Sequence, residues 1–172
     1  TLVYGLSERL TGFGGLQWAE DYQAANVGAG VNTGLGAFSA DVTQSISQAR
    51  VSKTSQGQSV RLRYANTLDV TNTTLAVAGY RYSTEQYRTL QEHVEELDGR
   101  IARTVTGRAK DRVELNVTQS LPEQSGSLSL TASDQRYWNL PGKTRQLYLS
   151  YNSAWKTVSY SLSIERNQQL DG

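Results

Sequence analysis

Few side chains in this sequence could perform catalysis or bind a metal. The 172 residues contain no cysteine and one histidine, which excludes thiolate chemistry and any site built from two imidazoles. A serine hydrolase would need that histidine, His93, as its base, but His93 lies in a long polar segment and is interpreted as a solvated loop residue. Asp41 and Glu114 carry no context that marks them as paired catalytic carboxylates. The sequence therefore predicts that the chain is not an enzyme and holds no metal or cofactor.

The charge balance gives no sign of a nucleic-acid partner. The sequence has 17 basic and 16 acidic residues, so its net charge is +1. Its one basic cluster contains no aromatic side chains that could stack on bases, and we interpret it as a solvated loop: Arg100, Arg103, Arg108, Lys110 and Arg112.

Apolar and polar residues alternate along most of the chain, as in strands with one apolar face. Between residues 59 and 66, for example, Val60, Leu62 and Tyr64 alternate with Arg61 and Arg63. About ten such segments fit into 172 residues, or roughly 17 residues per strand with its connection. This spacing is long for a sandwich and typical of membrane strands. The prediction is an all-β antiparallel up-and-down meander of about ten strands, forming a segment of a large transmembrane β-barrel.

The connections between these strands are expected to be short on one side of the sheet and, except at 20–23 and 139–143, long on the other. Compact turns are predicted at 7–10, 33–36, 67–72, 121–126 and 152–156, whereas 49–57 and 84–109 are long and polar. Outer-membrane barrels have short turns on the periplasmic side and longer loops outside. Aromatic residues lie near several of the predicted strand ends, as at a membrane interface: Trp18, Tyr64, Tyr82, Trp138, Tyr151 and Trp155.

Charge decides which face of the predicted wall meets water. An arginine in contact with lipid costs about 2–4 kcal/mol at the bilayer midplane, so the arginines must face an aqueous lumen. We expect five charged residues to line the pore: Asp41, Arg61, Arg63, Arg81 and Glu114. The residues expected to face lipid are Val42, Val60, Leu62, Tyr64, Val113, Leu115, Val117, Leu128, Leu130, Leu147, Leu149, Val158 and Leu162.

One segment of the long connection departs from the strand pattern. Leu90, Val94 and Leu97 recur at helical spacing, and Ser83 with Gln86 has the spacing of a capping box. A short helix is therefore predicted between residues 87 and 97.

A series of short motifs runs through nearly the whole chain. They include Tyr4-Gly5-Leu6, Gly14-Gly15-Leu16-Gln17, Gly28-Ala29-Gly30, Asp41-Val42-Thr43-Gln44-Ser45, Gly57-Gln58-Ser59-Val60-Arg61, Gly79-Tyr80-Arg81-Tyr82-Ser83-Thr84, Val117-Thr118-Gln119-Ser120-Leu121 and Tyr137-Trp138. Taken together, this series resembles the translocation pore of fimbrial outer-membrane ushers. The resemblance implies a protein of the chaperone-usher pathway that assembles and secretes pilus subunits delivered by a periplasmic chaperone.

The resemblance also implies a place in the cell and a set of partners. The expected location is the bacterial outer membrane, crossed many times by a barrel of about two dozen strands. The expected partners are pilin subunits, chaperone-subunit complexes and outer-membrane lipid. Residues 1–172 contain nothing similar to the usher N-terminal, plug or C-terminal periplasmic domains, so we expect them to form the middle of the barrel, after the plug insertion.

Two other classes remain open from the sequence. One is a self-contained ten-stranded outer-membrane barrel, acting as an adhesin or an enzyme, and the other is a soluble β-sandwich binding module. The three differ in what covers Val60, Leu62 and Tyr64: lipid in either barrel, and a second sheet in a sandwich.

Overall fold

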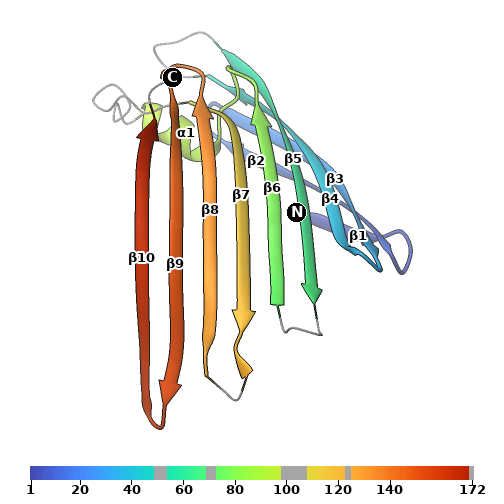
Figure 1. Cartoon of the computed structure of the whole chain (residues 1–172). Helices are drawn as coiled ribbons and strands as arrows, with labels where there is room; N and C mark the ends of the chain where they lie inside the picture. Colours follow the sequence, from blue (N-terminus) through green and yellow to red (C-terminus); the bar gives the residue numbers. More distant parts are fainter. Residues whose placement is uncertain (49–53, 69–72, 98–107, 123–124, 171–172) are drawn as a thin grey trace.

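A single antiparallel sheet contains all ten strands that the structure describes (Figure 1). The structure is a computed structural model, and it describes residues 1–48, 54–68, 73–97, 108–122 and 125–170. The strands are β1 (Leu2–Gly5), β2 (Leu10–Ala19), β3 (Tyr22–Thr33), β4 (Gly36–Ser47), β5 (Ser55–Leu68), β6 (Thr73–Ser83), β7 (Ala109–Ser120), β8 (Ser127–Tyr137), β9 (Lys143–Trp155) and β10 (Val158–Leu170). Each strand pairs with the next one in the sequence, which confirms the predicted meander.

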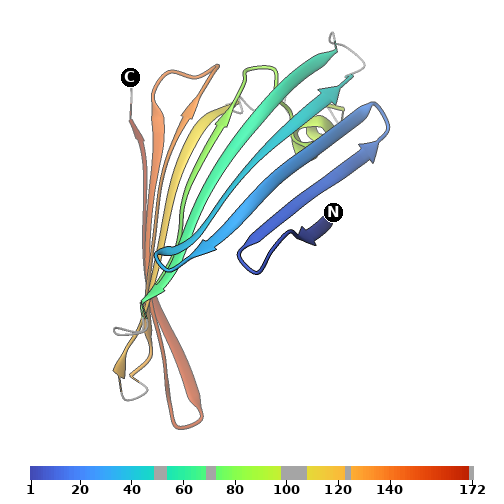
Figure 2. The ribbon, with the colours of Figure 1, turned by 90° about the vertical axis from the view of Figure 1, so that its right-hand side faces the viewer.

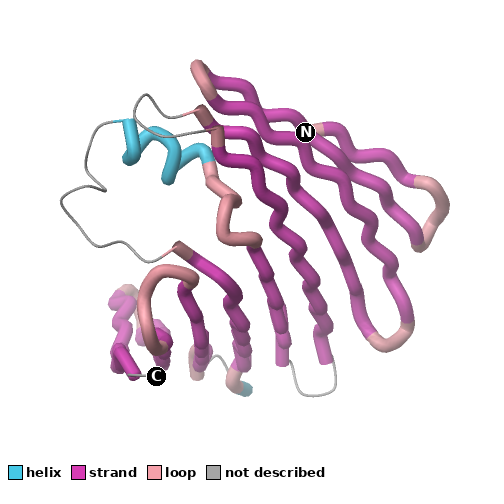
Figure 3. Tube along the Cα trace, turned by 90° about the horizontal axis from the view of Figure 1, so that it is seen from above, coloured by secondary structure: helices cyan, strands magenta, loops and turns pink. Residues whose placement is uncertain are grey.

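The sheet forms one curved layer, as seen from the side and from above (Figures 2 and 3). Helix α1 (Leu90–Leu97) lies on the concave side, near the end of the strands that carries the long connection between β6 and β7. The strand order runs from β1 to β10 without pairing these two strands to each other. The described sheet is therefore open, with one free edge on each side, and does not form the self-contained ten-stranded barrel.

Tight turns at the end opposite α1 fix the register of several strand pairs. Between β9 and β10, Lys156 adopts a positive φ of 56°, so that the two strands pair as far as Trp155 and Val158. The compact connection predicted at 152–156 is therefore too long. The alternation of apolar and polar residues weakens over 152–155, but β9 still pairs with β10 there. At the start of β5 the prediction also erred, since pairing with β4 already begins at Ser55.

A bulge in β6 keeps the two faces of the sheet in alignment. The pairing of β6 with β7 shifts register between Ala76 and Ala78, which leaves one extra residue in β6. Leu75 is consequently opposite Val117, on the same face as Leu115, although simple alternation from Arg81 would place it on the other face.

The wall has almost no conventional hydrophobic core. Among the described residues, the only buried hydrophobic ones are Tyr22 and Ala24. Large apolar side chains are instead exposed along the strands, including Val27 and Leu162, both at 68%. No second sheet packs on them in the described part of the chain, so the soluble β-sandwich is not favoured.

Candidate functional site

The two faces of the sheet have opposite chemistry. Register places all five charged residues predicted to line the pore on one face. Asp41 is opposite Arg61, and Arg61 is opposite Arg81. Gly79 is opposite Arg63 on one side and opposite Glu114 on the other, so these two residues also share that face. The same face carries Ser45 and Ser47, which contact the α1 segment, so it is the concave face.

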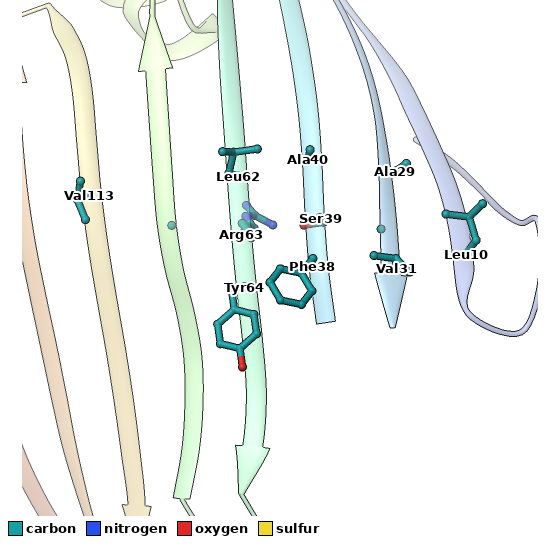
Figure 4. A pocket seen from close by; sticks show the side chains of 12 residues that line it. Leu10, Ala29, Val31, Phe38, Ser39, Ala40, Leu62, Arg63, Tyr64 and Val113 are labelled. Atoms are coloured by element: carbon teal, nitrogen blue, oxygen red, sulfur yellow. The ribbon is translucent and has the colours of Figure 1, made fainter. Parts of the chain in front are cut away.

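All the side chains predicted to face lipid lie on the other, convex face. Val42 is opposite Val60, Leu130 is opposite both Val117 and Leu149, and Leu162 is opposite Tyr151. A hollow of about 440 Å³ on this face is lined largely by apolar side chains, among them Val31, Phe38, Leu62 and Tyr64 (Figure 4). Geometry therefore groups the two predicted sets as expected, while their contact with water or lipid remains a prediction.

A row of arginines crosses the concave face. Arg61, Arg81 and Arg112 are direct neighbours on β5, β6 and β7. Asp41, only 4% exposed, accepts a hydrogen bond from Arg61 Nε at 2.8 Å, and the Nη2 of Arg112 lies 3.0 Å from Glu114 Oε2. With Arg63 there are four cations against two carboxylates, which leaves this patch with an excess of positive charge.

The middle arginine of the row connects the sheet to the segment before α1. Arg81 donates a hydrogen bond from Nε to Ser59 Oγ at 3.0 Å, and its guanidinium carbon lies 5.3 Å from the centre of the Tyr87 ring. This cation–π contact places the aromatic ring over the arginine row.

Helix α1 is attached to the concave face by buried polar contacts. His93, 1% exposed, has Nδ1 at 2.8 Å from Ser47 Oγ and Nε2 at 3.1 Å from the Glu20 carbonyl oxygen. The Tyr22 hydroxyl donates to the Arg88 carbonyl oxygen at 3.2 Å. The interpretation of His93 as a solvated loop residue is therefore wrong: His93 anchors the helix.

The predicted helix exists, but its capping residues differ from the prediction. Thr89 and Glu92 form the capping box: the Thr89 N–H donates to Glu92 Oε2 at 2.8 Å, and the Glu92 N–H donates to Thr89 Oγ1 at 3.2 Å. Of the apolar residues at helical spacing, Val94 and Leu97 are 47% and 38% exposed, so these two side chains are not buried by the sheet.

Aromatic rings lie near both ends of the convex face. At the end opposite α1, the Tyr64 hydroxyl donates to the Leu35 carbonyl oxygen and the Tyr151 hydroxyl donates to the Ser125 carbonyl oxygen. At the α1 end, Trp138 Nε1 donates to the Ser83 carbonyl oxygen at 2.8 Å. Their polar groups bond to strand ends and turns, an arrangement typical of aromatic residues at a membrane interface.

Sequence reasoning missed several functional candidates. Arg112 was assigned to a basic loop, but it lies in β7 on the face of Glu114, and alternation from Glu114 could have identified it. Lys110 is likewise in β7, while Arg100 and Arg103 lie outside the described residues. Charges on the convex face, such as Asp134 and Arg145, were also overlooked, although alternation from Leu130 and Leu147 reaches them.

No cluster suited to metal binding is found in the described ranges. Three or more histidine, aspartate or glutamate side chains do not come together anywhere in them. Within the same ranges, no helix is both long enough and apolar enough to cross a membrane.

Several known proteins similar to this chain point to one family. The family profile described as "Usher: Outer membrane usher protein" matches residues 1–171. The outer membrane usher protein FimD of Salmonella typhimurium is 38% identical over 182 residues, which cover 95% of this chain and 21% of FimD.

Two solved structures have the same fold over nearly the whole chain. One is an Escherichia coli P pilus tip assembly intermediate, PapC-PapD-PapK-PapG, with a TM-score of 0.74, 30% identity, and coverage of 98% of this chain and 21% of the matched chain. The other is the translocation pore of the P pilus usher PapC, with a TM-score of 0.70, 30% identity, and coverage of 96% and 34%. The chain thus spans about a fifth of FimD and a third of the solved pore. With a family match over nearly its full length, the chain belongs to the outer membrane usher family.

Proposed function

We propose that this chain is part of the wall of an outer-membrane usher pore, which assembles and secretes pilus subunits delivered by a periplasmic chaperone. The observation that carries the proposal is the two-faced open sheet. Large apolar side chains are exposed on strands from β1 to β10. Such a face requires an apolar environment, because soluble monomers rarely expose apolar patches of more than a few hundred Å². The acyl chains of a bilayer supply that environment.

The concave face suits the passage of folded protein. Its arginines and Glu114 are at least partly exposed, and desolvating them against an apolar surface is unfavourable, so a moving subunit gains little by adhering to them. Arg61, Arg63, Arg81, Asp41 and Glu114 are the proposed pore-lining residues. None of these roles requires a nucleophile or a cofactor, which fits a secretion pore and not an enzyme.

The open edges of the sheet suit a segment from the middle of a larger barrel. β1 and β10 each have one side without a partner strand in the described structure, and a barrel removes such edges by closure. We place the segment after the plug insertion, with the plug and the periplasmic domains outside residues 1–172. The partners that deliver and receive subunits then act through the whole usher.

Secretion can be tested with the complete parent gene. In a strain without other ushers, deleting this gene is expected to abolish surface pili and to leave chaperone-bound subunits in the periplasm, and returning it should restore pili. Electron microscopy and immunoblots of periplasmic fractions measure both outcomes. Normal piliation after the deletion would contradict the proposal.

The face assignment can be tested by thiol labelling in the full-length usher. Residues 1–172 lack cysteine, so introduced cysteines are the only thiols in this segment. Arg63→Cys and Ser39→Cys, on the concave face, should react with a membrane-impermeant maleimide in isolated outer membranes. Their neighbours Leu62→Cys and Ala40→Cys should be protected until detergent is added. Equal labelling of the two pairs would overturn the assignment.

A further inference from the structure

A belt of charged side chains borders the apolar wall on the convex face at the α1 end. Along β8 the apolar series Leu128, Leu130, Ala132 continues directly into Asp134 and Arg136. The register places Asp134 opposite Arg145, Arg136 opposite Lys143, and Arg166 opposite Leu147. We call these residues the basic belt: Asp111, Asp134, Arg136, Lys143, Arg145 and Arg166. By their numbers these residues lie toward the start of β7 and β9 and toward the end of β8 and β10, the ends of these strands that are uppermost in Figure 1.

Each acidic member of the belt pairs with at least one of its basic members. Arg136 Nε contacts Asp111 Oδ1 at 2.8 Å, and Asp111 is 6% exposed whereas Arg136 is 58% exposed. Arg145 Nη2 and Lys143 Nζ approach the same oxygen, Asp134 Oδ2, at 3.1 and 3.5 Å. Three cations thus pair with two carboxylates, and Arg166 adds a fourth cation, so the belt carries an excess of positive charge.

An amphipathic hollow adjoins the belt. Its volume is about 420 Å³, with Val113, Leu115 and Leu147 on its apolar part and Asp134, Arg145 and Arg166 on its charged part. Among the described residues Arg166 makes no ion pair, so its guanidinium is available to an external anion. A hollow lined by both apolar and cationic side chains matches a lipid with an anionic headgroup.

An aromatic pair marks the same end of the wall as a membrane interface. The Tyr82 and Trp138 rings meet edge to face with centroids 6.4 Å apart, and Lys110 Nζ lies 4.5 Å from the centre of the Trp138 ring. Amphipathic aromatic rings and lysines are typical of the headgroup level of a bilayer.

We propose that the basic belt binds the phosphate groups of a phosphorylated lipid in the outer leaflet, whose acyl chain occupies the adjoining hollow. The inference rests on the proposed membrane position of the wall. It assigns the belt to the outer leaflet because this end carries the long connection, and outer-membrane barrels place their longer loops outside. Arginines hold phosphates by charge-assisted, often bidentate hydrogen bonds, and Arg145 and Arg166 are the principal contacts.

The test measures binding of lipid A, which carries two phosphates, to the purified full-length usher in non-ionic detergent. We expect R145Q/R166Q to weaken binding by about 25-fold, because each basic residue near an anionic lipid surface contributes about fivefold in affinity. The control Arg63→Gln removes one positive charge from the concave face, away from the belt, and should stay within about twofold of the wild type. R145K/R166K should retain most of the affinity.

Wild-type protein provides a second measurement that needs no variant to fold. Its affinity for lipid A should exceed that for the fully dephosphorylated lipid and should fall as salt is raised. Equal affinity for the two lipids would overturn the inference, as would equal losses in R145Q/R166Q and Arg63→Gln. Displacement of lipid A by inorganic pyrophosphate at an equal concentration would overturn the lipid assignment in favour of a free-phosphate site.

Failure of this inference can be told apart from failure of the proposed function. Outer-membrane fractionation and heat-modifiable migration of the wild-type protein on gels report on the membrane barrel itself. An usher that passes both checks and secretes pili, yet binds lipid A and the dephosphorylated lipid with equal affinity, would overturn the lipid site alone.

Discussion

At the scale of single residues, one glycine decides how the segment before α1 lies on the sheet. A Cβ at Gly57 would sit 2.1 Å from the Tyr87 backbone nitrogen and 2.2 Å from its Cα. Only the absence of a side chain lets the backbone of residues 86–87 lie directly on β5. Arg88, the next residue in this segment, is 5% exposed.

Gly57→Ala should therefore displace this segment. Overpacking of this kind costs about 1–3 kcal/mol, which corresponds to at least about a fivefold increase in the detached population. Limited trypsin digestion of the full-length usher, followed by mass spectrometry, should show cleavage after Arg88 faster by about that factor. Gly30→Ala is the matched control, since a Cβ there meets its nearest atom at an ordinary 3.5 Å. Unchanged cleavage in Gly57→Ala would contradict the packing argument.

At the scale of elements, α1 is stabilised by its cap and by a histidine more than by apolar burial. Eight residues are too few for a stable isolated helix in water, so the helix depends on local and tertiary contacts. Thr89 satisfies the first turn through the capping box, and His93 ties the middle of the helix to Ser47 and Glu20. The helix is thus a part of the concave face and not a free loop.

Loss of the cap should loosen the helix without unfolding the sheet. Thr89→Ala removes the side-chain acceptor for the Glu92 N–H and should destabilise α1 by about 1 kcal/mol. Hydrogen exchange of peptides covering α1 should accelerate about fivefold, while exchange in β4 and β5 stays unchanged. Gln91→Ala, at an exposed position on the same turn, should have an effect of no more than about 0.5 kcal/mol. Equal exchange in the two variants would show that the capping box contributes nothing.

At the scale of the whole molecule, the wall is incomplete in two respects. Its apolar residues lack a covering layer, and its edge strands β1 and β10 lack partners within the described structure. β10 is 13 residues long and almost fully exposed, which makes it a template for pairing with another chain.

Residues 1–172 produced alone should therefore self-associate. In detergent the convex face is covered but the edges remain unpaired, so light scattering coupled to size-exclusion chromatography should detect oligomers or aggregates. The full-length usher, purified in the same detergent, is the control and should give a defined mass. A monodisperse monomer of 19.0 kDa for the isolated segment would contradict the edge argument.

Sequence alone determined the strands and the residues that share a face. Alternation with period two is a property of residue order, and it assigned Val60, Leu62 and Arg63 correctly relative to one another. Alternation is not a guide where a bulge adds a residue to one strand of a pair. The bulge in β6, for example, moves Leu75 to the convex face. Alternation also failed for charges such as Asp134, because the local pattern does not show where an apolar wall ends.

Only the tertiary structure decided which residues from distant strands act together. The row Arg61, Arg81, Arg112 requires the register of three strands, and that register depends on bulges and turns far from the arginines themselves. The burial of His93 requires contacts with Ser47 and Glu20, which precede it by 46 and 73 positions in the sequence. Such contacts depend on packing between remote segments, so local sequence patterns could identify the two faces of the wall but not the contacts that attach the helix or form the basic belt.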